Sequence, residues 1–271
     1  LTCEHPIVEL RVLKNGNLRI GTVMSFILGF GLYGSTFIVP LYTQSVLGWT
    51  ALQSGALMIP AALTTAFMMP IIGRLLTRGV KQQFLVALGL FIFFIYSFWG
   101  YKILTPDTGK DAFFWMLVMR GAGLGLLFIP ITSLSLSTLK GPQIGQGAAF
   151  TGMMRQLGGS FGVAAITTFI SNKSMFYRSD LVSKLDSNSM MVQQRLATLK
   201  ASFIAKGMTP DQALSAAYKV LDFSVSKQSA VLSYMDVFLY LGLMFLFCIP
   251  FILFVKEKKG GETIDLSEAM H

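Results

Sequence analysis

Long apolar stretches alternate with short polar connections along the chain. Six of these stretches reach the length of about 20 residues that spans a bilayer as a helix. They cover residues 20–46, 51–73, 82–101, 112–136, 147–171 and 234–255, each to within a few positions. Because an unpaired backbone group is costly in lipid, each stretch must be helical. The pattern predicts an all-α integral membrane protein with six transmembrane helices.

The same pattern divides the chain into segments. We expect a cytoplasmic connector at 1–19, five transmembrane helices within 20–171, an extracytoplasmic loop at 172–233, a sixth transmembrane helix at 234–255 and a cytoplasmic tail at 256–271. The chain opens on Leu1 rather than Met, so we expect 1–19 to continue from a longer protein.

The loop at 172–233 has helical character of its own. Leu196, Leu199 and Phe203 keep helical spacing, and the run from Thr209 to Gln212 has the residues of a helix start, with Pro210 at its first position. We expect a helical hairpin outside the membrane. It serves either as a solvated cap or as a docking surface for a periplasmic partner.

Composition supports the membrane class and excludes others. Hydrophobic residues make up 53% of the chain and charged residues 13%, against about 25% charged in soluble domains. The net charge of +9 does not indicate nucleic-acid binding, because the basic residues cluster at the ends of apolar stretches. Cys3 and Cys248 are not expected to pair. His5 and His271 lie outside the spans, and no metal-ligand spacing, nucleotide loop or nucleophile–base pair occurs, so we expect no enzyme, metal or cofactor.

Basic residues also predict the orientation. They gather on alternate short connections and in the tail, at Arg11, Lys14, Arg19, Arg74, Arg78, Lys81, Lys140, Lys256, Lys258 and Lys259. The opposite short connections carry only Lys102 and Lys110. By the positive-inside rule both termini are cytoplasmic. An aromatic belt is expected at the outer ends of the spans, from Trp49, Trp99, Trp115 and Tyr234.

Charge inside a membrane is expensive and commonly functional. Arg120 lies in the fourth span, just before Gly121 and Gly125, whose spacing suits close helix packing. Two interpretations of Arg120 stay open. It faces substrate or a carboxylate in a polar cavity, or it is a structural arginine that bonds helix-end carbonyls or reaches outward to the interface.

Arg155 lies in a small, polar stripe on the fifth span. Gln156 is beside it, and Gly158 and Gly162 form a second close-packing pair. This stripe is expected to face protein or a water-filled cavity. Asp236 begins the sixth span; it takes part in proton coupling, or it is an interfacial residue at a helix N-terminus, where the helix dipole favours an anion.

Aromatic and amide residues on two spans are candidates for an apolar substrate cavity. They are Tyr33, Phe37, Tyr42 and Gln44 on the first span and Phe128 on the fourth, to which Gln156 on the fifth is added. The competing interpretation is ordinary packing or lipid contact. Prolines at 40, 60, 70 and 130 interrupt three spans and permit the bending that transporters use.

One stretch carries a family resemblance. Residues 154–164, Met-Arg-Gln-Leu-Gly-Gly-Ser-Phe-Gly-Val-Ala, look like the penultimate helix of the EmrB/QacA-type drug:proton antiporters, the fourteen-helix branch of the major facilitator superfamily. Supporting stretches are 5–10, 48–55, 69–76, 120–126 and 234–238. Two motifs depart from the superfamily's pattern: the 73–79 loop has Thr77 where an Asp is usual, and the embedded carboxylates of the N-terminal half are not in this chain.

The resemblance implies the last six of fourteen helices, with a missing N-terminal half upstream. It implies export of lipophilic drugs across the bacterial inner membrane, driven by proton influx and alternating access. In Gram-negative members it also implies a periplasmic adaptor and an outer-membrane channel as partners. The competing hypotheses are export of one specific solute, such as a siderophore, peptide or lipid precursor, and a stand-alone membrane scaffold or pore.

Overall fold

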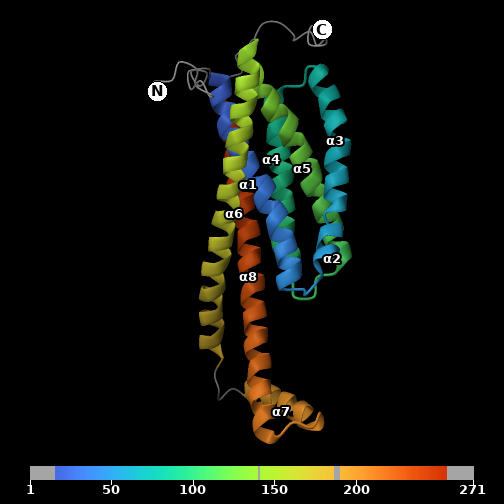
Figure 1. Ribbon diagram of the computed structural model, residues 1–271, viewed down its shortest axis with the longest axis vertical. Helices are drawn as coiled ribbons and strands as arrows, with labels where there is room; N and C mark the ends of the chain where they lie inside the picture. The colour runs from blue at the N-terminus through green and yellow to red at the C-terminus, as the bar shows by residue number, and fades with distance from the viewer. Residues whose placement is uncertain (1–15, 140, 186–189, 255–271) are drawn as a thin grey trace.

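The computed structural model describes residues 16–139, 141–185 and 190–254, and its ordered elements there are all helices. Predictions for the connector before residue 16, including Cys3 and His5, and for the tail beyond residue 254 lie outside these ranges. The helices are α1 (Gly16–Ser45), α2 (Ala51–Ala56), α3 (Ile59–Thr77), α4 (Gln82–Ile103), α5 (Lys110–Leu136), α6 (Pro142–Lys184), α7 (Met190–Ala205) and α8 (Pro210–Phe254), shown in Figure 1.

Across the described ranges, five helical segments are long and apolar enough to cross a membrane. They are α1, the α2–α3 segment, α4, α5 and α8. The fifth expected span, 147–171, lies within α6, which is not among them. Its run of glycine, threonine, glutamine and arginine lowers the hydropathy of that helix. The expected span at 147–171, and with it the count of six, therefore stays a prediction, while the all-helical membrane fold is confirmed.

Local sequence explains where several helices begin. Thr50 and Gln53 form a reciprocal capping box at the start of α2, with Gln53 N–H donating to Thr50 Oγ1 at 3.3 Å. The expected second span is divided, because α2 ends at Ala56 and Pro60 opens the first turn of α3. The helix start predicted at Thr209 is confirmed, since α8 begins at Pro210 and Thr209 N–H donates to the Gln212 side chain at 3.4 Å.

Helices α6 and α8 are longer than a bilayer requires. They contain 43 and 45 residues, which at about 1.5 Å per residue is roughly twice a hydrocarbon core. Figure 1 shows both running past the ends of the other helices, with α7 crossing the far end and packing on α8. No helix break occurs at 171 or 233, where we expected the membrane boundary. The helix-N-terminus interpretation of Asp236 is therefore wrong, because that residue lies deep inside α8.

Aromatic side chains fill the core between α1, α4, α5 and α8. Phe93 packs on Phe245 with ring centroids 4.4 Å apart, and both are fully buried. Tyr234 is only 3% exposed and meets the edge of Tyr42 at 5.3 Å. Tyr234 was expected in an interfacial belt, but its ring is buried inside the bundle rather than exposed on the helix surface.

Glycines bring two pairs of helices into backbone contact. A methyl group on Gly158 of α6 would overlap the carbonyl of Phe26 on α1, and one on Gly162 would lie 2.9 Å from the carbonyl oxygen of Phe30. At the α3–α5 crossing, a methyl group on Gly121 would overlap the Ala61 carbonyl, and one on Gly125 would lie 2.8 Å from Met68 Cβ. Such crossings suit small-residue packing in membranes.

Candidate functional site between α1, α5, α6 and α8

Arg120 is held inside the bundle by α1. Its Nε donates to Ser35 Oγ at 2.9 Å, and its Nη2 donates to the Thr36 hydroxyl and to the Leu32 carbonyl at 3.4 Å. The residue is 5% exposed. No described carboxylate forms an ion pair with it. The arrangement matches a structural arginine more closely than one facing an open cavity, although its acceptors lie within a helix rather than at its end.

Arg155 and Gln156 of α6 contact two different helices. The Arg155 guanidinium lies 4.4 Å from the centroid of the Phe128 ring on α5. The Gln156 side-chain oxygen accepts a hydrogen bond of 2.8 Å from the Tyr33 hydroxyl on α1. Within the residues that the structure describes, Arg155 makes no ion pair. Its half-buried charge is therefore stabilised by an aromatic face rather than by a carboxylate.

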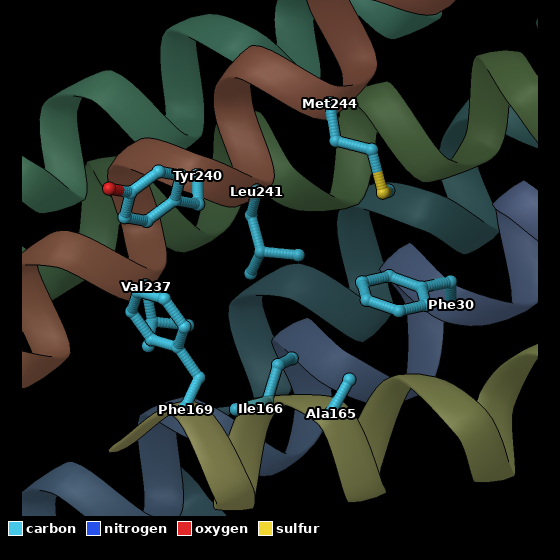
Figure 2. A pocket seen from close by; sticks show the side chains of 8 residues that line it. All are labelled: Phe30, Ala165, Ile166, Phe169, Val237, Tyr240, Leu241 and Met244. Atoms are coloured by element: carbon cyan, nitrogen blue, oxygen red, sulfur yellow. The ribbon is translucent and has the colours of Figure 1, made fainter. Parts of the chain in front are cut away.

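An apolar pocket lies between α1, α6 and α8. Its volume is about 180 Å³, and its lining is Phe30, Ala165, Ile166, Phe169, Val237, Tyr240, Leu241 and Met244. Figure 2 shows Leu241 and Met244 of α8 pointing toward Phe30 of α1 and toward Ala165 and Ile166 of α6. Phe169 and Tyr240 close one side, edge to face at 4.9 Å. We call this the α1–α6–α8 pocket.

A charged cluster adjoins this pocket through Phe169 and Tyr240. Lys173 Nζ of α6 lies 3.1 Å from Asp236 Oδ2 of α8, and the Tyr177 hydroxyl donates to the same oxygen at 2.8 Å. The side chains of Lys173 and Asp236 are 29% and 18% exposed. The ammonium also faces the rings of Phe169 and Tyr240, with centroids at 5.6 and 5.9 Å. The cluster ties α6 to α8.

The environment of the cluster shifts two ionisation equilibria. The hydrogen bond to Asp236 raises the pKa of Lys173, because it stabilises the charged ammonium. Partial burial, and then the hydrogen bond to Asp236, raise the pKa of Tyr177, so its phenol stays neutral and continues to donate. Both shifts extend the pH range over which the donor set of Asp236 stays protonated toward higher pH.

The structure brings together only some of the residues expected at a cavity. Tyr33 and Gln156 bond to each other, and Phe128 contacts Arg155. Tyr42 is separate from them: it is fully buried, and its hydroxyl donates to the Thr105 carbonyl at 2.7 Å. Tyr42 is thus a core residue and not part of an open cavity.

Phe37 and Gln44 also stand apart from the α1–α6–α8 pocket. None of the six expected cavity residues is among the residues that line it, and Gln44 is exposed near the end of α1. Whether any of the expected cavity residues binds a substrate stays a prediction.

Sequence reasoning missed the partners of Asp236. The signal was present as spacing, because Phe169, Lys173 and Tyr177 follow one another at four-residue intervals and so share a face of α6. Asp236 and Tyr240 repeat that interval on α8. We had assigned residues beyond 171 to a separate loop, so the two faces were not compared.

The fold and these features define a multi-pass helical membrane protein whose polar and aromatic residues lie at helix crossings. The chain belongs to the Major Facilitator Superfamily, whose family model matches residues 4–163. This places it in a class of transporters rather than of enzymes.

Three curated relatives span nearly the whole chain. It is 28% identical to the uncharacterized MFS-type transporter YhcA of Bacillus subtilis, over 98% of this chain and 51% of that protein. It is 24% identical to the fatty acid resistance protein FarB of Neisseria gonorrhoeae, over 95% of this chain and 49% of FarB. Identity to the multidrug export protein EmrB of Escherichia coli is 24%, over 96% of this chain and 49% of EmrB.

These relatives confirm the resemblance to EmrB-type transporters within the superfamily. The chain spans about half the length of the relatives it matches.

Proposed function

We propose that this chain forms part of a secondary active transporter that exports lipophilic or amphipathic compounds in exchange for protons. The proposal places it in the bacterial inner membrane with both termini of this segment cytoplasmic. The observation that carries it is the α1–α6–α8 pocket, an apolar cavity between helices of a family member. The names of EmrB and FarB, a multidrug export protein and a fatty acid resistance protein, agree with such substrates.

The size of the pocket supports partial rather than complete enclosure of a substrate. A cavity of about 150 Å³ lined by apolar side chains accommodates benzene, and this one is about 180 Å³. It has room for one ring or a short alkyl group of a larger molecule. Pro40 of α1 and Pro130 of α5, inside neighbouring helices, supply points at which a binding cavity can change shape.

Proton coupling requires a group that exchanges protons in contact with the transport path. Asp236 is a carboxylate beside the pocket, since Val237 and Tyr240, its neighbours on α8, line it. We propose Asp236 as a coupling residue of this segment, with Arg120 and Arg155 as fixed charges. The proton gradient is the energy source, and we propose no cofactor. The part of α6 beyond residue 171, the part of α8 before residue 234, and α7 are the proposed contact for a periplasmic adaptor and an outer-membrane channel.

The test is a deletion of the complete gene that carries these residues, complemented from a plasmid. We expect hypersensitivity to several unrelated lipophilic compounds, reversed by the wild-type gene. Intracellular accumulation of a fluorescent substrate should rise when a protonophore collapses the gradient. Unchanged susceptibility to a broad panel would contradict multidrug export, and a change confined to one compound class would favour the specific-solute alternative.

A matched pair of variants links export to the pocket. Ala165→Phe fills the cavity, whereas Ala164→Phe places the same ring on the neighbouring exposed position of α6, which does not line it. Complementation should fail with the first variant and persist with the second at equal protein levels. Equal complementation by both variants would show that the pocket is not part of the transport path.

A further inference from the structure

We propose that Asp236, Tyr177 and the surrounding rings form a binding site for the ammonium head of an amphipathic cation. The Lys173 ammonium occupies this site when no ligand is bound. The inference rests on the proposed function, because it names a substrate class for the same pocket. We define the ammonium box as Asp236, Lys173, Phe169, Phe176, Tyr177 and Tyr240.

The ammonium box has the chemistry of a cation site. Lys173 Nζ lies between 5.6 and 6.0 Å from the ring centroids of Phe169, Phe176, Tyr177 and Tyr240. Asp236 supplies the counter-charge at 3.1 Å. Several aromatic faces together with a carboxylate are the arrangement by which proteins recognise alkylammonium groups. Here the group they surround is the chain's own lysine.

The box and the pocket are continuous. Phe169 and Tyr240 face the Lys173 ammonium and also line the α1–α6–α8 pocket. The cavity beyond them is apolar, with Phe30, Leu241 and Met244 on its walls (Figure 2). A ligand with its charge in the box therefore has its apolar body in the pocket. The expected ligand is a small aryl or alkyl group joined by a short spacer to an amine or quaternary ammonium.

Lys173 then acts as a competitor tethered to α6. Its side chain is 29% exposed, so the flexible four-carbon stem can swing outward when another cation enters. Phe176 and Tyr240 are 63% and 50% exposed, which leaves the box open on one side. The Asp236 carboxylate repels an anionic ligand, so the site selects against anions.

The charge of Asp236 is neutralised in either state, by lysine or by ligand. The carboxylate is therefore not left as an unpaired, partly buried charge.

The experiment measures equilibrium binding to the complete gene product in nanodiscs with no ion gradient. Three probes share a phenethyl body: phenethyltrimethylammonium, its neutral carbon isostere, and phenylpropanoate as the anion. We expect the cation to bind most tightly to the wild type. Lys173→Met should tighten cation binding about ten-fold, and Asp236→Asn should weaken it about ten-fold, each corresponding to about 1.4 kcal/mol. Neither change should affect the neutral probe by more than about two-fold.

Control variants separate this role from a structural one. Lys184→Met removes another α6 lysine, which pairs with Asp180 and is 70% exposed, and should leave cation binding unchanged. If Asp236→Asn does not fold, Lys173→Met/Asp236→Asn removes both charges and should bind the cation no better than the neutral probe. Phe169→Leu should weaken binding of the cation more than it weakens binding of the neutral isostere.

The same measurement distinguishes a lipid from a soluble amine. If phosphatidylethanolamine displaces the cationic probe and phosphatidylglycerol does not, the ligand of the site is the amine head group of a membrane lipid. If neither lipid displaces the probe, the ligand is a soluble amphiphile. Weaker cation binding in Lys173→Met, or a preference of the wild type for the anion, would overturn the proposal. Because no gradient is present, these outcomes do not depend on whether the deletion strain shows an export phenotype.

Discussion

Gly158 of α6 lies directly against the backbone carbonyl of Phe26 on α1, so that no side chain separates the two helices there. Further along, Gly162 meets Phe30 in the same way, and Phe30 is also a wall of the α1–α6–α8 pocket. The glycines thus set the helix separation on which that pocket depends.

Gly158→Ala is predicted to destabilise the protein by about 1–3 kcal/mol, because the added methyl group overlaps a backbone atom that cannot rotate away. Gly152→Ala is the matched control: it lies in the same helix with no atom within 4 Å of an added methyl group. That control should be neutral or more stable by up to about 1 kcal/mol, since alanine favours helix. Thermal unfolding of the purified full gene product measures both, and equal melting temperatures would contradict the close crossing.

Arg120→Lys is predicted to cost about 1.5–3 kcal/mol, because an ammonium cannot reproduce the guanidinium bonds to Ser35, Thr36 and Leu32. Ser35→Ala should destabilise the wild type but add little to Arg120→Lys, since the two residues share one interaction. Ser224→Ala is the control, because the Ser224 hydroxyl donates to the nearby Val220 carbonyl of its own helix. Strictly additive changes in unfolding free energy would argue against the Arg120–Ser35 bond.

Alkaline pH is predicted to weaken the α6–α8 contact. The folded-state pKa of Lys173 is raised above its usual 10.5, so the ion pair contributes fully below that pH and is lost as pH rises through the folded pKa. The raised pKa of Tyr177 acts in the same direction, because ionising its phenol removes the donor to Asp236. The wild type should therefore lose more thermal stability than Lys173→Met as the pH rises above 10.5. Identical pH profiles would show that the pair contributes nothing.

Phe128→Leu is predicted to reduce export, because it removes the aromatic face that stabilises the Arg155 charge between α5 and α6. A cation–π contact of about 0.5–2 kcal/mol corresponds to roughly a two- to thirty-fold effect on a step that requires this geometry. Phe67→Leu, at a ring on α3 that is 69% exposed, is the control. Initial rates in energised inverted vesicles provide the measurement. Phe128→Leu should add nothing to Arg155→Gln if the ring acts through the arginine.

The transmembrane part of the fold was largely accessible from the sequence, because lipid demands long apolar helices. The expected boundaries of α1, α4 and α5 agree with the structure to within four residues. The lengths of α6 and α8 were not accessible in this way. Beyond residue 171 and before residue 234 these helices leave the strongly apolar pattern, and their continuity depends on packing against each other and on α7.

The candidate site was only partly accessible, for a different reason. Hydrophobic pattern identifies residues that are unusual in lipid, such as Arg120 and Arg155, but not their partners. Tyr33 and Gln156 are 123 positions apart, and Tyr177 and Asp236 are 59 apart, so only the folded arrangement pairs them. Tyr42 shows the converse error: its aromatic type suggested a cavity, whereas its hydroxyl serves the connection between α4 and α5.

The uninterrupted course of α8 gives the molecule a mechanical property. A single helix carries both the apolar residues that pack among α1, α4 and α6 and the outer turns on which α7 rests. Because one helix joins these two parts, a tilt of α8 at its packed end would also displace the turns that carry α7. Asp236 pairs with Lys173 of α6 part-way along this helix, so such a tilt would also change the contact between α8 and α6.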